Sequence, residues 1–280
     1  MVNAEAIEAW NTVLFDKFTR YRATLDTMLG VHGARAIARH APAAGTRVVD
    51  IGCGFGETTI ELARRAGSAV GIDAAPRFVA AARESAARAG VDSARFEVAD
   101  VEAGVPGGPF DLAFSRMGTM FFASPVIALR NIRTALRAGG TLCMVVWRKK
   151  DANPCLHVPE LVARELLGEP DKNDQVTCGP GPFSMASADL VGDQLVAAGY
   201  TDLAFERSDA DVAIGRDLDE AVQFAIELGP AGEIVRLAGD EAVRRRPELD
   251  RAMKSALAPH LRDGAVRAAS SCWIVTARVP

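Results

Sequence analysis

Glycines and an acid stand together where an apolar run ends near residue 50. Residues 47–51 read RVVDI, and the chain continues GCGFG over residues 52–56. Glycines at a turn between a strand and a helix let the backbone approach a ligand closely. Ligands of open parallel sheets bind at the carboxyl ends of the strands. The pattern therefore predicts a small-molecule site that contains Asp50, Gly52, Cys53 and Gly54.

The spacing of these glycines differs from the dinucleotide fingerprint G-x-G-x-x-G. The third glycine comes one residue early, and Glu57 stands where it would be needed. Carboxylates at Asp50 and Glu57 would repel a pyrophosphate and attract a cation. S-adenosylmethionine carries an ammonium and a sulfonium and no phosphate, so the pattern favours this ligand over a dinucleotide.

Two further acids follow the next two predicted strands. Asp73 ends the strand 69–73, and a carboxylate there can accept hydrogen bonds from both hydroxyls of a ribose, in NAD as well. Asp100 and Val101 follow the strand 95–99, where a carboxylate can accept from the exocyclic amine of adenine. Each acid alone is equally explained as a helix cap or turn residue. Together, beside the glycines, the three acids favour a nucleoside site.

Strands and helices alternate through the central part of the chain, which positions these acids. The expected strands are 47–51, 69–73, 95–99, 110–115 and 141–147, and the expected helices are 58–66, 76–90 and 126–137. This alternation predicts βαβ units and a doubly wound parallel sheet. Further on, we expect helices at 158–167, 188–198 and 218–228, a helical region to about 262, and strands at 200–214 and 271–278.

The flanking regions suggest four segments. Residues 1–43 form a helical cover of two helices, with a break at Gly30 and Gly33, and residues 44–147 form the ligand-binding core. Residues 148–186, rich in proline and glycine, form a lid or insertion. Residues 187–280 complete the sheet and carry a helical cap insertion over about 216–264.

Composition excludes several classes of protein. The apolar content of 49% and the net charge of −4 exclude a disordered chain and argue against a nucleic-acid partner. The five cysteines form no CxxC pair, so we expect neither a disulfide framework nor a metal site. We find no secretory signal and no apolar run long enough to span a membrane, which together with the reduced thiols suggests a cytoplasmic protein.

Residues 46–147 resemble the core of the class I S-adenosylmethionine-dependent methyltransferases, in particular quinone-biosynthesis C-methyltransferases. VVDIGCGFG, GIDAAP and FEVADVE are similar to the first three motifs of that family, and FDLAFSRMGTMFFASP and NIRTALRAGGTLCMVVW to the fourth and fifth strand regions. AWN, the NP at 153–154, FSMASADLVGDQLVAAGYTD and CWIVTAR extend the resemblance to one bacterial subgroup.

The resemblance implies a Rossmann-like α/β fold, a doubly wound, mostly parallel seven-stranded sheet whose last strand runs antiparallel. It also implies roles for individual residues. Asp50, Gly52 and Gly54 would hold the methionine part of the cofactor, and Asp73 and Ala74 the ribose and adenine edge, while Asp100 and Val101 would hold adenine, Ser115 would contact the methionine end through its backbone, and Phe18 would lie near the cofactor. We interpret Cys53 as a small buried residue of the loop rather than a nucleophile.

Apolar residues after the fourth strand suggest an acceptor pocket. Its candidate wall residues are Trp10, Met117, Met120, Phe121 and Trp147, although core packing explains the same residue types. His157 is the candidate general base, and a structural histidine is the alternative. The stretch Ser115-Arg116-Met117-Gly118 stands where N-P-P-Y or D-P-P-Y marks methylation of nucleobase or amide nitrogens, which argues against a nucleic-acid acceptor.

These observations predict transfer of a methyl group from S-adenosylmethionine to oxygen or carbon of a small, largely apolar metabolite, leaving S-adenosylhomocysteine. Two alternatives stay open: an oxidoreductase that uses a dinucleotide, and a non-catalytic domain that binds S-adenosylmethionine or its demethylated product. The sequence also leaves the oligomeric state open, with a homodimer as one option.

Overall fold

The computed structural model describes residues 3–40, 42–168 and 180–280. The strands are β1 (Val48–Ile51), β2 (Ala69–Asp73), β3 (Ala94–Val98), β4 (Phe110–Arg116), β5 (Leu136–Trp147), β6 (Thr201–Gly215), β7 (Leu261–Arg262) and β8 (Ala265–Arg278). The helices are α1 (Ala4–Ala9), α2 (Phe15–Arg20), α3 (Arg22–Arg39), α4 (Glu57–Ala66), α5 (Pro76–Ala89), α6 (Pro125–Ala135), α7 (Pro154–Leu167), α8 (Ala188–Ala197), α9 (Leu218–Glu227), α10 (Gly229–Ala238), α11 (Asp240–Arg244) and α12 (Arg246–Leu257). A π-helical turn, Trp10–Leu14, joins α1 to α2.

The strands form one sheet in the order β3-β2-β1-β4-β5-β8-β6, with the short β7 paired to β8. The pairs among β1 to β5 are parallel, whereas β8 runs antiparallel to both β5 and β6. All four residues of β1 are buried, as expected for a central strand covered on both faces. The predicted seven-stranded, mostly parallel sheet with an antiparallel last strand is therefore confirmed, with β7 as a short addition.

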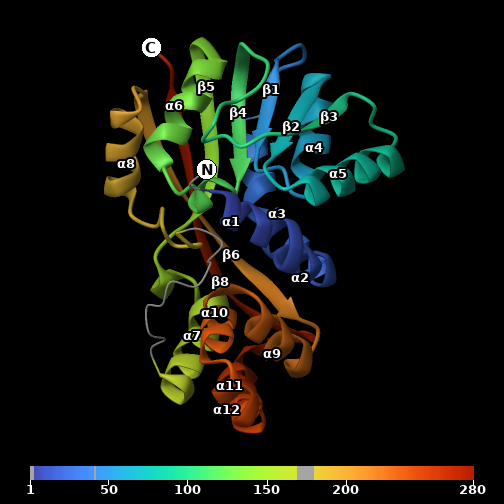
Figure 1. Ribbon diagram of the computed structural model, residues 1–280, viewed down its shortest axis with the longest axis vertical. Helices are drawn as coiled ribbons and strands as arrows, with labels where there is room; N and C mark the ends of the chain where they lie inside the picture. The colour runs from blue at the N-terminus through green and yellow to red at the C-terminus, as the bar shows by residue number, and fades with distance from the viewer. Residues whose placement is uncertain (1–2, 41, 169–179) are drawn as a thin grey trace.

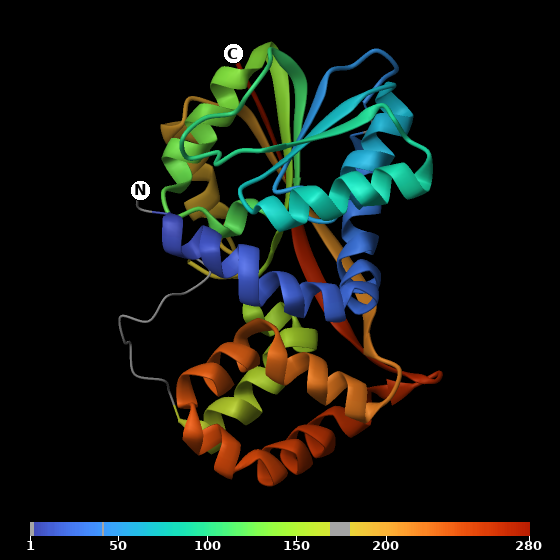
Figure 2. The ribbon, with the colours of Figure 1, turned by 45° about the vertical axis from the view of Figure 1, so that its right-hand side comes forward.

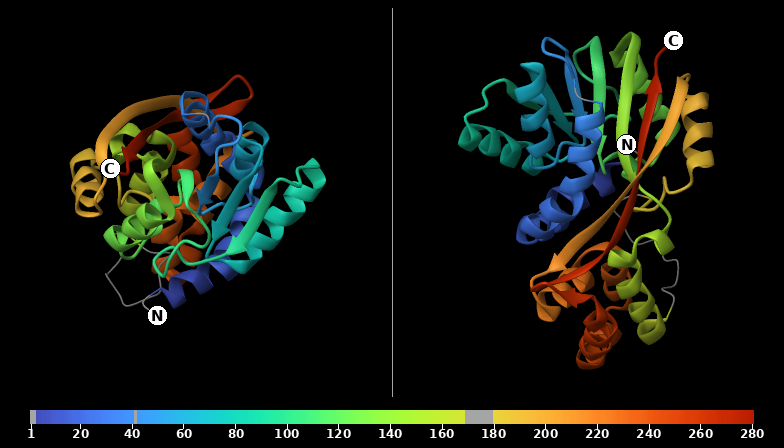
Figure 3. Two further views of the ribbon diagram at one scale, coloured as in Figure 1. Left: turned by 90° about the horizontal axis from the view of Figure 1, so that it is seen from above. Right: turned by 180° about the vertical axis from the view of Figure 1, so that it is seen from behind.

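The molecule extends well beyond this sheet. Figure 1 shows α7 and α9 to α12 grouped at the lower end of the molecule, and β6 and β8 run from the sheet down to this group. The same two long strands are seen from behind in Figure 3. Figure 2 shows α1 and α2 crossing between the sheet and the lower helices. We refer to α7, α9, α10, α11 and α12 as the lower helices.

The N-terminal helices differ from the prediction. The helix break lies at Tyr21, whose ring packs against Phe224 of α9 at 5.5 Å between centroids, and not at Gly30 and Gly33. Helix α3 continues through both glycines. A Cβ at Gly33 would lie 2.8 Å from Cδ of Arg116, so this glycine serves close packing rather than a turn. The contact between Tyr21 and the distant Phe224 sets the position of the helix break, although glycine has the weaker helix propensity.

Two strands are longer than predicted. The expected helix 126–137 ends at Ala135, because Leu136 pairs with Phe110 and the N–H of Gly139 donates to the carbonyl of Val279 at 2.9 Å. Strand β8 begins at residue 265 rather than 271, and its added length pairs with β6. Helix α7 begins at Pro154 rather than residue 158, and residues 169–179 of the expected lid lie outside the described residues.

No helix among the described residues has the length and apolar character needed to cross a bilayer.

Asn153 fixes the start of α7 against β8. This fully buried side chain accepts from the N–H of Ser271 at 2.7 Å and donates to the carbonyl of Ser271 at 3.0 Å. Its amide also lies 3.1 Å from the carbonyls of Arg148 and Lys149. One side chain thus satisfies backbone groups of two segments that are distant in sequence.

We expect Asn153→Ala to lower the free energy of unfolding by about 2–4 kcal/mol, because each buried backbone group left without a partner costs about 1–3 kcal/mol. Chemical denaturation measures the change. Lys149→Ala, at an exposed neighbour, is the control and should change stability by less than about 0.5 kcal/mol. A small effect of Asn153→Ala would show that the bonding at this junction is dispensable.

Candidate functional site

A cavity of about 1020 Å³ lies between the carboxyl ends of the parallel strands, the N-terminal helices and the lower helices. Its wall includes nearly all the residues that the sequence singled out, from five strand ends and from α2 and the turn before it. These lining residues are Trp10, Phe18, Asp50, Gly52, Cys53, Gly54, Asp73, Ala74, Asp100, Val101, Met117, Met120, Phe121 and Trp147. The fold therefore brings together side chains that lie up to 137 residues apart in sequence (147 − 10 = 137).

The glycine loop after β1 is tied to the end of β2. Asp73 accepts from the N–H of Gly54 and from the N–H of Ala75, each at 3.0 Å. Gly52, Gly54 and Gly56 adopt positive φ angles of 68°, 54° and 89°. Side chains are disfavoured in this conformation. The loop therefore exposes backbone to the cavity at positions that glycine alone occupies without strain.

Asp50 is buried at the end of β1, with 1% of its surface exposed. Thr59 donates a hydrogen bond of 2.6 Å to its Oδ2. Burial raises the pKa of Asp50 to about 7, against the lowering effects of Thr59 and of the positive charge on Arg116. A carboxylate in this place would gain stability from a cationic ligand, which would lower its pKa again.

The other two acids occupy the adjacent strand ends. The pKa of Asp73 is raised, chiefly by burial and against the hydrogen bonds from Ala75 and Gly54. One oxygen of Asp100 accepts from the N–H of Glu102 at 2.9 Å. Among the residues that the structure describes, neither Asp50 nor Asp73 forms an ion pair within 4.0 Å. The three acids thus form a row along the strand ends, which we call the acid rim.

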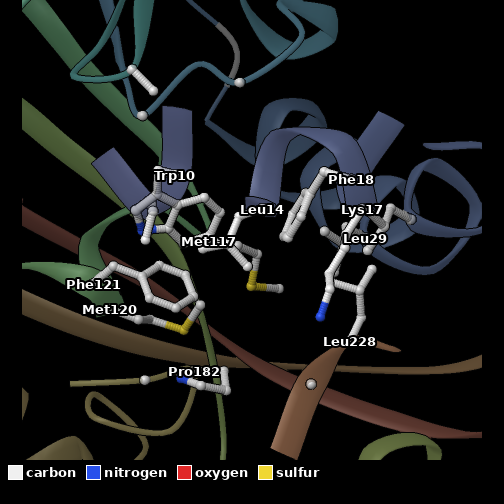
Figure 4. A pocket seen from close by; sticks show the side chains of 18 of the residues that line it. Trp10, Leu14, Lys17, Phe18, Leu29, Met117, Met120, Phe121, Pro182 and Leu228 are labelled. Carbon is white, nitrogen blue, oxygen red and sulfur yellow. The ribbon is translucent and has the colours of Figure 1, made fainter. Parts of the chain in front are cut away.

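Aromatic rings from the N-terminal helices cover the acid rim. The ring of Trp10 meets Phe18 at 5.2 Å and Phe121 at 4.9 Å between centroids, both edge to face. Phe18 in turn meets Phe78 of α5 at 6.1 Å. Figure 4 shows Trp10 and Phe121 beside one another on one wall of the cavity, and Phe18 beside Lys17. Such a cover keeps water from the ligands it encloses.

The candidate acceptor wall is apolar and well packed. Met120 and Trp147 are at most 3% exposed, and Met117 adopts a positive φ of 62° directly after β4. Figure 4 places the side chains of Met117 and Met120 toward the centre of the cavity, near Phe121. The predicted residues of this wall therefore lie together, although Trp147 also packs edge to face with the buried His32.

Two predicted residues lie elsewhere. Ser115 is fully buried and absent from the cavity wall, since its hydroxyl donates to the carbonyl of Ile51 at 2.8 Å and ties β4 to β1. His157 is also absent from the wall, and its Nδ1 lies 3.3 Å from Oε2 of Glu160. The expected methionine contact of Ser115 and the expected base role of His157 therefore lack support in this geometry.

Several positively charged residues of the cavity wall were not predicted from the sequence. Glu57 forms ion pairs with Arg22 and with Arg116, the latter at 3.8 Å. Its negative charge is thus compensated, which corrects the expectation that Glu57 itself repels a phosphate. Lys17 also lines the wall. Local patterns could not reveal these residues because their partners lie far away along the chain.

Comparison with known proteins identifies the central region. Residues 42–179 match the family model described as a methyltransferase domain. This region is a methyltransferase domain, and it is similar to class I S-adenosylmethionine-dependent methyltransferases. Strand order and the glycine loop with its acid rim agree with that assignment.

Individual relatives match parts of the chain. The 23S rRNA (uracil(1939)-C(5))-methyltransferase RlmD of Azoarcus sp. (strain BH72) is 39% identical over 84 residues, which are 28% of this chain and 19% of RlmD. Aklanonic acid methyltransferase DauC of Streptomyces sp. (strain C5) is 34% identical over 114 residues, which are 39% of this chain and 52% of DauC. The chain thus spans between a fifth and about a half of the length of these relatives.

The solved structure of the YcgJ protein from Bacillus subtilis shares the fold. It superposes with a TM-score of 0.56 and 18% identity, covering 90% of this chain and 98% of YcgJ. At this level of identity the likeness concerns the architecture alone.

The glycine loop allows a matched pair of substitutions. A Cβ at Gly56 would lie 2.9 Å from Cβ of Ala82 and from the ring of Phe96, whereas a Cβ at Gly54 meets nothing within 4 Å. We expect Gly56→Ala to destabilise the protein by about 2–4 kcal/mol, from a positive φ and overpacking together. Gly54→Ala should lower the free energy of unfolding by only about 1–2 kcal/mol, because of the positive φ angle alone. If thermal unfolding shows that both variants lose the same stability, the packing argument is contradicted.

Proposed function

We propose that this methyltransferase binds S-adenosylmethionine along the acid rim and transfers its methyl group to oxygen or carbon of a small, largely apolar metabolite. The observation that carries the proposal is the row of carboxylates without ion pairs beside an apolar cavity large enough for a second reactant. A ligand with an ammonium and a sulfonium compensates these charges, and a pyrophosphate adds to them.

The proposed contacts follow from the positions of the groups on the wall. Asp50, with the backbone of Gly52 and Gly54, faces the methionine part, and Cys53 packs behind the loop. Asp73 and Ala74 hold the ribose, and Asp100 and Val101 hold the adenine. Phe18 and Trp10 cover the bound cofactor, where their rings shield the sulfonium from water. The segments 148–186 and 216–264 are proposed as the substrate cap.

Methyl transfer is an in-line displacement at the methyl carbon. The acceptor's lone pair forms the new bond, the carbon–sulfur bond breaks, and its electron pair stays on sulfur, giving S-adenosylhomocysteine. Holding two reactants in line inside a dry cavity contributes about 7–11 kcal/mol to lowering such a barrier. The chain's contribution is therefore orientation by the apolar wall and exclusion of water by the aromatic cover.

The apolar wall supports a small, apolar acceptor. Met117, Met120, Phe121 and Trp147 present sulfur and ring surfaces that suit an aromatic or aliphatic body. The net charge of −4 counts against a polyanionic acceptor such as RNA. DauC, named for an organic acid, supports the same class of acceptor.

A labelled-methyl assay separates catalysis from binding alone. The purified chain is incubated with S-adenosylmethionine labelled in its methyl group and a panel of phenols, quinones and carboxylic acids. We expect label to enter at least one class of acceptor. Binding of S-adenosylmethionine without transfer to any acceptor would instead indicate a non-catalytic cofactor-binding domain.

We expect Asp73→Ala to weaken binding of S-adenosylhomocysteine by about tenfold to hundredfold, since a hydrogen bond to a charged group contributes about 1.5–3 kcal/mol. Asp73→Asn, which keeps one acceptor oxygen, should lose less. Asp111→Ala is the control, because Asp111 stands at the opposite end of its strand and outside the cavity wall. Unchanged calorimetric affinity in Asp73→Ala would contradict the ribose assignment.

Affinity for S-adenosylmethionine should depend on pH through Asp50. The free carboxyl has a pKa of about 7, and the cationic ligand favours its ionised form, so binding releases a proton. Affinity is then full above about pH 7 and falls by up to about tenfold per pH unit below it. Asp50→Asn should bind weakly with a flat profile. A flat profile in the unaltered protein would contradict the role of Asp50.

A further inference from the structure

Lys17 places a positive charge on the cavity wall, beside apolar side chains. It belongs to α2 and lines the cavity, and Figure 4 shows its side chain beside Phe18 and Leu29 with the ammonium nitrogen directed toward Leu228. Leu14 and Met117 are the other labelled side chains on this side of the cavity. An ammonium in such surroundings interacts with an opposite charge more strongly than it would in water.

The polar group that Lys17 contacts is uncharged. Its Nζ donates to the backbone carbonyl of Glu227 at 2.9 Å. Within the described ranges 3–40, 42–168 and 180–280, Lys17 forms no ion pair within 4.0 Å. An ammonium has three N–H donors, and one carbonyl satisfies one of them.

The nearby carboxylate of Glu227 is already compensated. Arg20 forms an ion pair with it at 2.6 Å, and a hydrogen bond between Tyr21 and Glu227 contributes, after burial, to raising the pKa of Tyr21 to about 12. Elsewhere on the wall, Glu57 is shared by Arg22 and Arg116, and Glu160 is paired with Lys150. The charge of Lys17 is thus left to be compensated by a bound molecule.

We propose that Lys17 binds the anionic oxygen of the methyl acceptor, which is an apolar molecule carrying an acidic hydroxyl or carboxyl group. The inference deepens the proposed function and rests on it. The acid rim then faces the cationic cofactor, and Lys17 faces the anionic acceptor.

This assignment also accounts for the proton. An acceptor that binds as an anion supplies its lone pair to the methyl carbon directly, and the sulfonium becomes a neutral thioether as the carbon–sulfur bond breaks. No proton has to be removed during the transfer, so the reaction needs no general base. His157 is not among the residues of the cavity wall, in keeping with this route.

Isothermal titration with two matched probes tests the proposal. 2-Naphthoic acid and its neutral counterpart 2-naphthalenemethanol are titrated into the full chain saturated with S-adenosylhomocysteine. We expect the unaltered protein to prefer the acid by about tenfold, since one ion pair in an apolar cavity contributes on that scale. Lys17→Met should remove this preference while affinity for the alcohol changes by less than about twofold. Lys17→Arg should retain it.

Arg20→Met serves as the matched control, because Arg20 joins α2 to the same residue of α9 and does not line the cavity. It should keep the preference for the acid. The proposal is overturned if the unaltered protein shows no preference, or if Arg20→Met loses it as Lys17→Met does, since Lys17 would then act as a structural link between α2 and α9.

A third probe separates the two kinds of acid. 2-Naphthol changes its ultraviolet absorption on ionisation, so a bound spectrum of the anion indicates an acidic hydroxyl, whereas binding of the carboxylate alone indicates a carboxylic acid. The affinity for S-adenosylhomocysteine is measured in each variant. If the unaltered protein does not bind S-adenosylhomocysteine, the proposed function is refuted. If it binds S-adenosylhomocysteine but shows no preference for the acid, only the role of Lys17 is refuted.

Discussion

The uncompensated charge of Asp50 and Asp73 constrains the rest of this molecule. A carboxylate held at a buried strand end without a cation is unfavourable, and the raised pKa of Asp50 expresses that cost. Thr59 and the N–H groups of Gly54 and Ala75 offset a part of it. The chain therefore keeps an arrangement that a positively charged ligand would stabilise, and this arrangement is where we place the cofactor.

The fold creates the second half of the site by extending two strands. Strands β6 and β8 continue past the parallel core and carry the lower helices, so the acid rim faces helices that the core alone would lack (Figure 3). The N-terminal helices close the space between the sheet and the lower helices. Contacts of Lys17 and Arg20 with Glu227 join this cover to α9.

The sequence predicted the core of this arrangement because its signals are local. The glycines after β1 and the acids ending β2 and following β3 are adjacent to apolar runs, and a parallel sheet brings such ends to one edge. The break at Tyr21 and the strand character of Leu136 could not be read in this way. The break at Tyr21 depends on Phe224, and the strand character of Leu136 depends on Phe110. Both partners lie far away along the chain.

Charges were harder to predict than positions. Glu57 was expected to act as a free carboxylate, and two arginines from α3 and from the end of β4 compensate it. His157 was expected near the acceptor because of its place after β5, yet its neighbour one turn on, Glu160, faces the cavity instead. Lys17 gave no signal, since a lysine on an amphipathic helix is ordinarily exposed. Ion pairs between distant elements set which charges a ligand meets.

The central claim is that the acid rim accepts a cationic nucleoside and rejects a pyrophosphate. Calorimetric titration of the full chain with S-adenosylmethionine and, separately, with NADH at neutral pH tests it most directly. The account predicts saturable one-to-one binding of S-adenosylmethionine and no measurable heat of binding with NADH. Tight binding of NADH, or no binding of S-adenosylmethionine, would contradict it.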